Sequence, residues 1–169
     1  MFGLFQSVRT KGTRAAIAAV QPMLGGLQSF AGPGIPAGMW QDPYVLGYIN
    51  MTISMWAKLY TNGKAEGGEL GLILIDVYSA VSHQNGLAIT SLAADLTQQQ
   101  HPDFIRGMED AMLVFLYGQN RLNQEIHPVL VQAKTDAAAM GKANDKVAIS
   151  GLMLMATWYK EVKRLAADR

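Results

Sequence analysis

The sequence predicts an all-α protein, a compact bundle of six to seven helices with an N-terminal arm that is weakly basic and free of acidic residues. Apolar residues recur at three- and four-residue spacing in several segments. Capping residues and prolines precede these segments, and few stretches alternate with the two-residue period of a strand. With 169 residues, 50% hydrophobic and 16% charged, the chain is long enough for a single domain with a buried core.

The segment 1–38 is expected to hold the arm, the first helix and a Gly/Pro linker, ahead of a helical core over residues 39–169. No acidic residue precedes Asp42, so this segment carries only positive charge. The first helix is expected near residues 13–30, followed by the linker Ala-Gly-Pro-Gly-Ile-Pro-Ala-Gly. The residues expected to pack this helix on the domain are Ala16, Ile17, Val20, Leu24 and Leu27.

The arm combines bulky apolar residues with three cations and has two main interpretations. In one, its apolar residues fold over the core. In the other, they insert into a membrane surface or a partner while the cations meet anionic groups, which gives weak and reversible binding. A mitochondrial transit peptide is a third possibility, whereas Gly and Pro between residues 15 and 41 argue against a membrane-spanning helix. The candidate contact residues are Phe2, Leu4, Phe5, Arg9, Lys11 and Arg14.

The second helix has the clearest start, because Asp42 is a suitable N-cap and Pro43 suits the first helical position. Its end is predicted at Asn62-Gly63. The next two helices are expected over residues 69–83 and 88–98. The first of these two is short and partly β-branched, so a buried strand is the alternative there. The apolar face of the second helix consists of Val45, Ile49, Ile53, Trp56 and Tyr60.

Three more helices are expected towards the C-terminus, over residues 103–118, from residue 123 or 128 to 140, and after Asp145. His101 and His127 each precede a proline, which predicts helix entry rather than metal ligation. The last helix is free of charge from residue 147 to 159 and then becomes basic. A helix that is apolar all round is expected to be central, with an exposed tail.

Three polar side chains on the expected helix 69–83 form the candidate ligand-binding set. Glu69, Asp76 and His83 are spaced by seven residues and therefore share one helical face. If that face lines a cleft, the carboxylate and the imidazole suit proton transfer or ligand binding. The alternative is a polar stripe that faces water. Asp76 and His83 are two turns apart, roughly 10 Å, which is too far for a direct hydrogen bond.

Several function classes lack support in the sequence. The absence of cysteine excludes thiolate metal sites, disulfides and cysteine nucleophiles. No histidine has the spacing of a helical metal motif, and no phosphate-binding or serine-nucleophile motif occurs. A net charge of +1 gives no basis for nucleic-acid binding. No catalytic residue, metal or cofactor is therefore assigned.

The hypothesis that remains is a non-enzymatic, cytoplasmic interaction protein, which associates with itself or with a protein partner through an apolar helical face. Methionine is abundant on the expected helices and suits adaptable binding surfaces. Low charge content also favours an exposed apolar patch that a partner covers. Two alternatives stay open: a helical bundle that binds lipid, haem or isoprenoid in its interior, and an enzyme that uses Asp76 or His83. A further alternative is peripheral membrane association through residues 1–14.

Overall fold

The computed structural model describes residues 7–31, 36, 38–122 and 127–167, and every regular element in these ranges is helical. The predicted all-α class is confirmed, and the strand alternative for the third helix is wrong. The elements in chain order are α1 (Val8–Ala31), η1 (Met39–Gln41), α2 (Pro43–Tyr60), α3 (Gly67–Ser82), α4 (Gly86–Gln98), α5 (Pro102–Gly118), α6 (Pro128–Ala139), α7 (Lys146–Leu154), η2 (Met155–Tyr159) and α8 (Lys160–Ala167).

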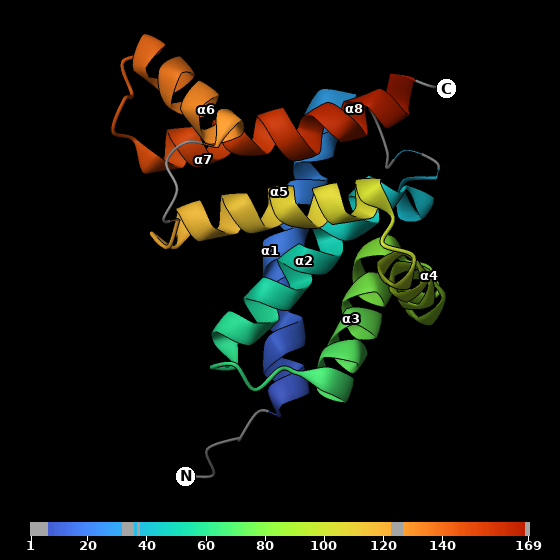
Figure 1. Ribbon diagram of the computed structural model, residues 1–169. Coiled ribbons are helices and arrows are strands. Elements are labelled where there is room, and N and C mark those ends of the chain that lie inside the picture. The colour runs from blue at the N-terminus through green and yellow to red at the C-terminus, as the bar shows by residue number, and fades with distance from the viewer. Residues whose placement is uncertain (1–6, 32–35, 37, 123–126, 168–169) are drawn as a thin grey trace.

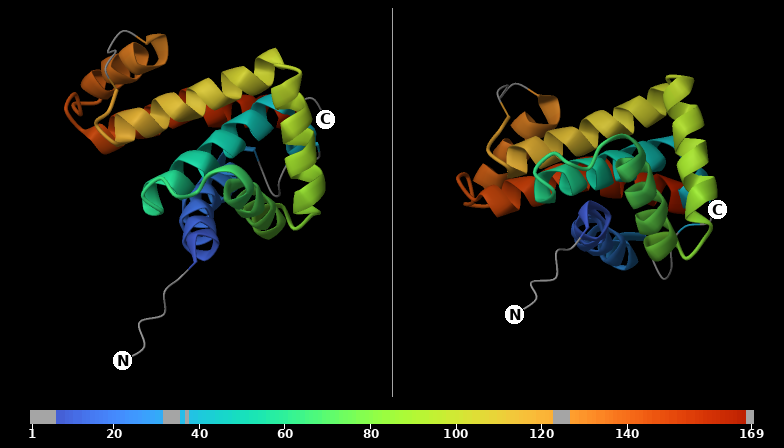
Figure 2. Two further views of the ribbon diagram at one scale, coloured as in Figure 1. Left: turned by 60° about the horizontal axis from the view of Figure 1, so that its bottom comes forward. Right: turned by 90° about the horizontal axis from the view of Figure 1, so that it is seen from below.

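The helices form two groups that cross each other (Figure 1). In one group α1 packs against α2 and α3, and α4 packs against α3. In the other group α5 lies beside a continuous rod made of α7, η2 and α8, and α6 folds back onto α7. Figure 2 shows α5 and this rod crossing one end of α1 and α2. The two groups therefore enclose an angle, and α2 is the helix that joins them.

The junction between α2 and α5 is a direct backbone contact made by two buried glycines. A Cβ atom added at Gly47 would lie 2.0 Å from the carbonyl oxygen of Phe104. A Cβ atom added at Gly107 would lie 2.1 Å from the carbonyl oxygen of Tyr44. The contact is reciprocal, so neither helix can carry a larger residue at the crossing unless the backbones move apart. Tyr44, Tyr48 and Phe104 are fully buried around it.

α1 begins about one and a half turns before its predicted start at residue 13. The Ser7 hydroxyl accepts a hydrogen bond from the backbone N–H of Thr10 at 3.1 Å, which caps the helix. The first turns carry polar and charged residues, so apolar periodicity could not reveal them. The predicted inner face is confirmed: Ala16, Val20 and Leu27 are buried, and Ile17 and Leu24 pack against the same core. No helix among the described residues is long and apolar enough to cross a membrane.

The other helix starts agree with the sequence signals. The Asp42 carboxylate accepts a hydrogen bond from the N–H of Val45 at 3.0 Å, and Pro43 occupies the first turn of α2. Both histidines predicted at helix entry are N-caps, of α5 and α6. His127 accepts a hydrogen bond from the N–H of Val129 through Nδ1 at 3.3 Å, whereas Nδ1 of His101 is buried without a partner.

The charge-free part of the C-terminal helix, residues 147–159, was predicted to be central, and this is wrong for its first half. Val147 is 82% exposed, and α7 packs with α6 around a small separate core. The buried apolar positions along the rod are Ile149, Met153, Trp158 and Val162, spaced by four, five and four residues, and the polar Thr157 is buried beside Trp158. The spacing of five coincides with η2, a π-helical segment that widens one turn by a residue. This wider turn brings Trp158 and Val162 onto the main core.

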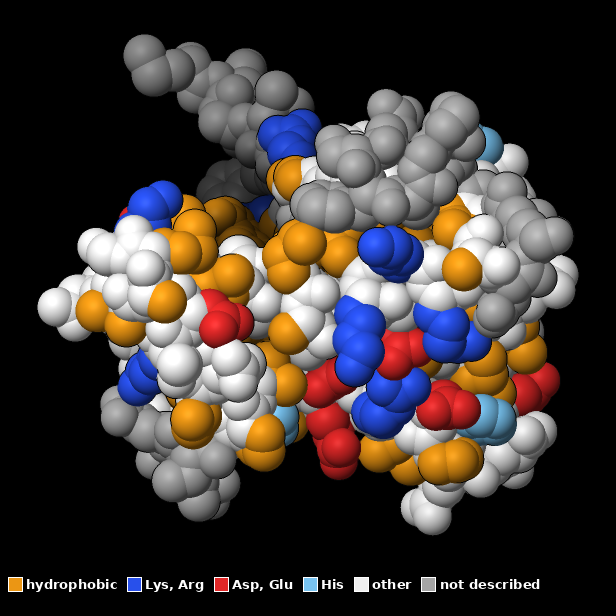
Figure 3. All heavy atoms as spheres, turned by 90° about the horizontal axis from the view of Figure 1, so that it is seen from above, with side chains coloured by type: hydrophobic (Ala, Val, Ile, Leu, Met, Phe, Trp, Pro, Cys, Tyr) orange, Lys and Arg blue, Asp and Glu red, His pale blue; other side chains and the backbone are white. Residues whose placement is uncertain are grey.

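A surface network of charges holds α8 against α5 and the start of α2. Glu161 accepts hydrogen bonds from Arg106 at 2.9 Å and from Arg164 at 3.0 Å. Arg164 also donates to the N-cap carboxylate of Asp42 at 3.3 Å, and Arg106 contacts Asp103 at 3.2 Å. Acidic and basic side chains gather on the face of Figure 3, which is the view from above. The network joins residues that lie far apart in the chain, so it stabilises the arrangement of the two helix groups.

The glycine crossing predicts a large difference between equivalent substitutions. Gly47→Ala and Gly107→Ala should each lower the free energy of unfolding by about 2–3 kcal/mol, because a methyl group would overlap backbone atoms. The control is Gly71→Ala in the middle of α3, where a Cβ atom meets nothing within 4 Å. Higher helix propensity should make this control about 0.5–1 kcal/mol more stable. Urea denaturation measures all three, and equal effects at the three positions would contradict the crossing.

Candidate functional site

A groove runs between α1 and α2 and continues beneath α5 and α7. It consists of an outer hollow of about 490 Å³, lined by α1 and the last turns of α2, and an inner hollow of about 250 Å³, lined by α1, α2, α5 and α7. Ala19 and Trp56 line both hollows, so the two are adjacent. We call this feature the aromatic groove.

Three aromatic rings form the floor of the aromatic groove. The rings of Trp56 and Tyr60 stack with centroids 5.8 Å apart, as expected for residues four apart on a helix. Phe115 of α5 meets Trp56 edge to face at 5.6 Å. Tyr60 is 48% exposed, so the floor is open to solvent at its outer end. Trp56 and Tyr60 lie on the face of α2 that the sequence predicted to be apolar, but neighbouring helices do not cover them completely.

Small side chains on α1 form the wall that leaves these rings accessible. Ala15, Ala18 and Ala19 line the outer hollow, and Met23 lies further along α1 in the inner hollow. Their spacing places them on one side of α1, next to the face that packs into the core. Leu154 of α7 contributes to the inner end. The wall is therefore apolar along its length.

The hydroxyl groups of Thr52 and Tyr48 at the inner end are bonded within the protein, and the polar side chains of Gln119 and Ser150 also line this hollow. The Thr52 hydroxyl donates to the carbonyl oxygen of Tyr48 at 2.8 Å. The hydroxyl groups of Tyr48 and Thr157 lie 3.3 Å apart. Burial raises the pKa of Tyr48 well above that of an exposed phenol, so this ring stays neutral. The inner hollow is lined by no charged side chain in the part of the chain that the structure describes.

Two of the cations predicted to meet a partner lie at the outer end of the aromatic groove. Lys11 and Arg14 line the outer hollow, and neither has a carboxylate partner among the described residues. Arg9 instead forms a two-pronged ion pair with Asp76, with Nε–Oδ2 and Nη2–Oδ1 distances of 2.6 Å. The three cations therefore differ in role, although their positions in the sequence did not separate them. Phe2, Leu4 and Phe5 lie outside the described residues.

The set Glu69, Asp76 and His83 is not brought together around a cleft. Asp76 faces α1, where Arg9 and the Thr13 hydroxyl (3.5 Å) bind it. Chiefly the hydrogen bond from Arg9 holds the pKa of Asp76 below its usual range. Glu69 is exposed in the first turn of α3, and His83 is the exposed C-cap residue, with a left-handed φ of 57°. Ligand binding by these residues stays a prediction.

The main lining of the aromatic groove was not predicted as a site. The sequence predicts Trp56 and Tyr60 on the apolar face of α2, and it gives no role to Ala15, Ala18 or Ala19. The available signal was the arrangement of Ala15, Ala18 and Ala19 at helical spacing beside two unpaired cations, on a helix without acidic residues. Phe115 could not be linked to Trp56 from sequence, because the two lie on different helices. No group of three or more His, Asp or Glu side chains is placed to hold a metal among the described residues.

The Arg9–Asp76 pair predicts a pH-dependent contribution to stability. The lowered pKa of Asp76 means that this contribution is complete above the unfolded-state value of about 4 and is lost as the pH falls through the lower folded value. Asp76→Asn should therefore be less stable than the wild type at pH 7, and the difference should shrink below about pH 4. Urea unfolding across this range measures it. Asp95→Asn on α4 is the control, and a gap for Asp76→Asn that does not change with pH would contradict the assignment.

Comparison with known proteins does not add a function to this geometry. No family model, curated protein or solved structure matches the chain. The interpretation of the aromatic groove therefore rests on its lining residues, their exposure and their charge.

Proposed function

We infer that this chain is a non-enzymatic helical binding protein whose aromatic groove holds an elongated apolar ligand. The observation that carries the proposal is that two adjacent hollows share Ala19 and Trp56 and lie over an aromatic floor that solvent reaches. Small-ligand sites are mostly apolar and measure about 300–1,000 Å³, and the outer hollow falls in this range. Each 100 Å² of apolar surface that a ligand removes from water favours binding by about 2.5 kcal/mol.

The residues that line the groove favour ligand binding over catalysis. Neither hollow is lined by a histidine or a carboxylate among the described residues, so the site offers no evident general acid or base. The groove is also long and open to solvent, which suits an acyl or isoprenoid chain better than haem. This proposal places the ligand in a groove between helices, whereas the sequence suggested an enclosed interior.

Filling the aromatic groove should weaken the binding of a neutral apolar probe. Ala19→Leu adds bulk at the junction of the two hollows and should lower the affinity for Nile red about five-fold or more, equivalent to the loss of about 1 kcal/mol. The control Ala80→Leu makes the same change at an exposed position of α3 and should leave the affinity unchanged. Fluorescence titration measures all three proteins. Equal affinities would contradict the proposal, as would a wild type that binds no probe.

A second candidate function is self-association through the C-terminal lobe, by which we mean the C-terminal half of α5 together with residues 128–155, which hold α6, α7 and the first residue of η2. Large apolar side chains are exposed there, and some reach the surface over α6 and α7 at the left of Figure 3. Val147 is 82% and Met140 59% exposed. Exposed apolar patches often mark interaction surfaces. The exposed apolar residues of the lobe are Met112, Val131, Met140, Val147 and Met155.

Light scattering tests self-association directly. We expect the molar mass to rise above the 18.3 kDa of one chain as the protein concentration increases. Val147→Glu should restore the mass of a single chain, because it places a charge in the interface. Leu87→Glu on α4, also an exposed apolar position, is the matched control and should not. A mass of one chain at all concentrations would contradict this candidate.

A further inference from the structure

This inference rests on the proposed function. The positive charge at the outer end of the aromatic groove limits the class of ligand that the groove can bind. Lys11 and Arg14 are the charged residues that line the two hollows in the described part of the chain. α1 carries no acidic residue over its whole length, so no carboxylate on that helix neutralises them. The groove therefore has a positive outer end and an uncharged inner end.

The neighbouring ion pair between Arg9 and Asp76 explains why the positive charge at the outer end of the groove is not neutralised. Arg9 and Arg14 lie on the same stretch of α1 and line a common hollow with Asp76, yet Asp76 binds Arg9 at 2.6 Å. Asp76, the one carboxylate among the residues that line this adjacent hollow, is therefore already paired with Arg9. An anion at the outer end of the groove would meet an ammonium and a guanidinium group. The guanidinium group can bind a carboxylate through two parallel hydrogen bonds.

The length of the groove sets the size of the apolar part. Lys11 and Met23 mark its two ends on α1, and a helix of that length rises about 18 Å. An extended covalent chain advances about 3.5 Å for every three bonds, by analogy with an extended backbone. A chain of roughly fifteen bonds would therefore span the groove from the cations to the inner end. This corresponds to a single acyl chain of roughly 12–16 carbons.

We propose that the aromatic groove binds a free fatty acid as its anion. The carboxylate lies between Lys11 and Arg14, and the chain runs over Trp56 and Tyr60 towards Met23. The order of these contacts follows from the charge of the lining, because Lys11 and Arg14 line the outer hollow and no charged side chain among the described residues lines the inner hollow. A headgroup buried at the inner end would lack a cation among the lining residues.

Calorimetric titration with three ligands of equal chain length tests the charge preference. The ligands are dodecanoate, dodecan-1-ol and dodecylammonium, each kept below the concentration at which it aggregates. Dodecanoate should bind more tightly than the alcohol, and the ammonium should bind most weakly. The double substitution Lys11→Gln, Arg14→Gln should weaken dodecanoate binding about 5- to 20-fold, because each exposed ion pair is worth about two- to five-fold. The same substitution should weaken binding of the alcohol much less than binding of dodecanoate, because the alcohol carries no charge, and a helical circular dichroism spectrum should show that the variant folds.

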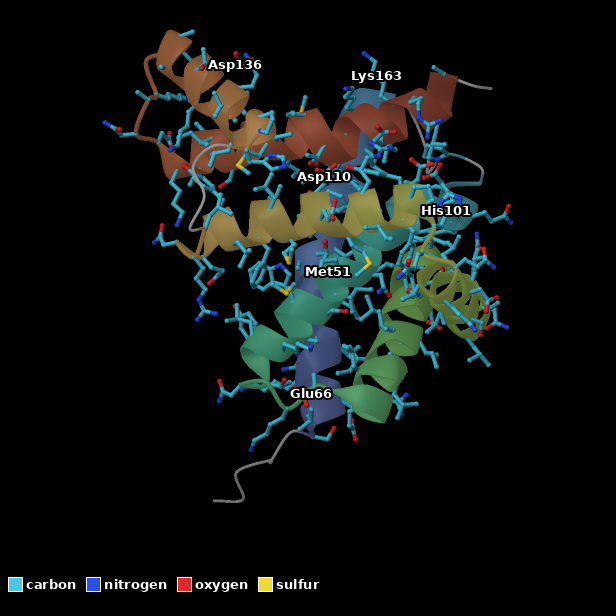
Figure 4. All side chains as sticks on the ribbon, viewed as in Figure 1. Met51, Glu66, His101, Asp110, Asp136 and Lys163 are labelled. Carbon is cyan, nitrogen blue, oxygen red and sulfur yellow. The ribbon has the colours of Figure 1, made fainter. Side chains whose placement is uncertain are left out.

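The matched control is Lys163→Gln on α8. Lys163 lies at the upper edge of the molecule in Figure 4, whereas Glu66, just before α3, marks the lower end, where α1 begins. Lys11 and Arg14, which line the outer hollow, belong to the first turns of α1. This change removes a positive charge without touching the groove, so dodecanoate affinity should stay at the wild-type level. An equal loss in Lys163→Gln and in the double variant would show a general charge effect and would overturn the proposal.

The failures of this inference and of the proposed function are distinguishable. If dodecanoate and dodecan-1-ol bind the wild type equally while Nile red still binds in the aromatic groove, the fatty-acid assignment is wrong and the binding function stands. If dodecanoate, dodecan-1-ol and Nile red all fail to bind, the fatty-acid assignment and the proposed binding function are both wrong. Flotation with phosphatidylglycerol vesicles covers the remaining source of anions. Vesicle binding that the double variant abolishes, without binding of free dodecanoate, would assign Lys11 and Arg14 to a membrane surface and overturn the proposal.

Discussion

The reciprocal contact of Gly47 and Gly107 is the constraint on which the rest of the structure depends. At this point the backbones of α2 and α5 touch, and further along both helices the aromatic rings of Trp56 and Phe115 stand between them. The two helices therefore diverge from the glycine crossing towards their C-terminal ends. This divergence opens the angle between the two helix groups in Figure 1 and leaves the aromatic rings incompletely covered. A looser crossing would alter both the core and the aromatic groove.

The aromatic groove follows from this divergence together with the small residues of α1. Larger side chains at Ala15, Ala18 and Ala19 would fill the space above Trp56 and Tyr60 and extend the core. The alanines instead leave apolar surface in contact with water, which is unfavourable in a free protein and becomes favourable when a ligand covers it. The unpaired Lys11 and Arg14 at the open end, next to the engaged pair Arg9–Asp76, give the groove a direction.

Local signals in the sequence predicted much of the fold. The cap at Asp42, the proline after it and the apolar face of α2 all follow from rules that act within one or two turns. The same rules placed His101 and His127 at helix starts. The π-helical turn at residues 155–159 escaped prediction, because a segment without charge does not show which face is buried. Its signature is a spacing of five between Met153 and Trp158, which becomes visible only once burial is known.

The candidate site was predicted less completely than the fold, because it depends on distances between helices. Periodicity placed Trp56 and Tyr60 on an apolar face, but it could not show how far the neighbouring helices extend over that face. Asp76 was identified as an unusual polar residue on an apolar helix, and its partner Arg9 lies 67 positions earlier in the chain. Nothing local distinguished Gly47 from the other helical glycines, since its role is set by Phe104 on another helix.

The most direct measurement of the central claim is an NMR titration of protein labelled at alanine and methionine methyl groups. Addition of dodecanoate should shift the methyl signals of Ala15, Ala18, Ala19 and Met23, which line the aromatic groove. The signal of Met140, exposed on the C-terminal lobe, should stay in place. Shifts confined to Met140 and its neighbours, or no shift at any of the four groove methyl groups, would contradict the account.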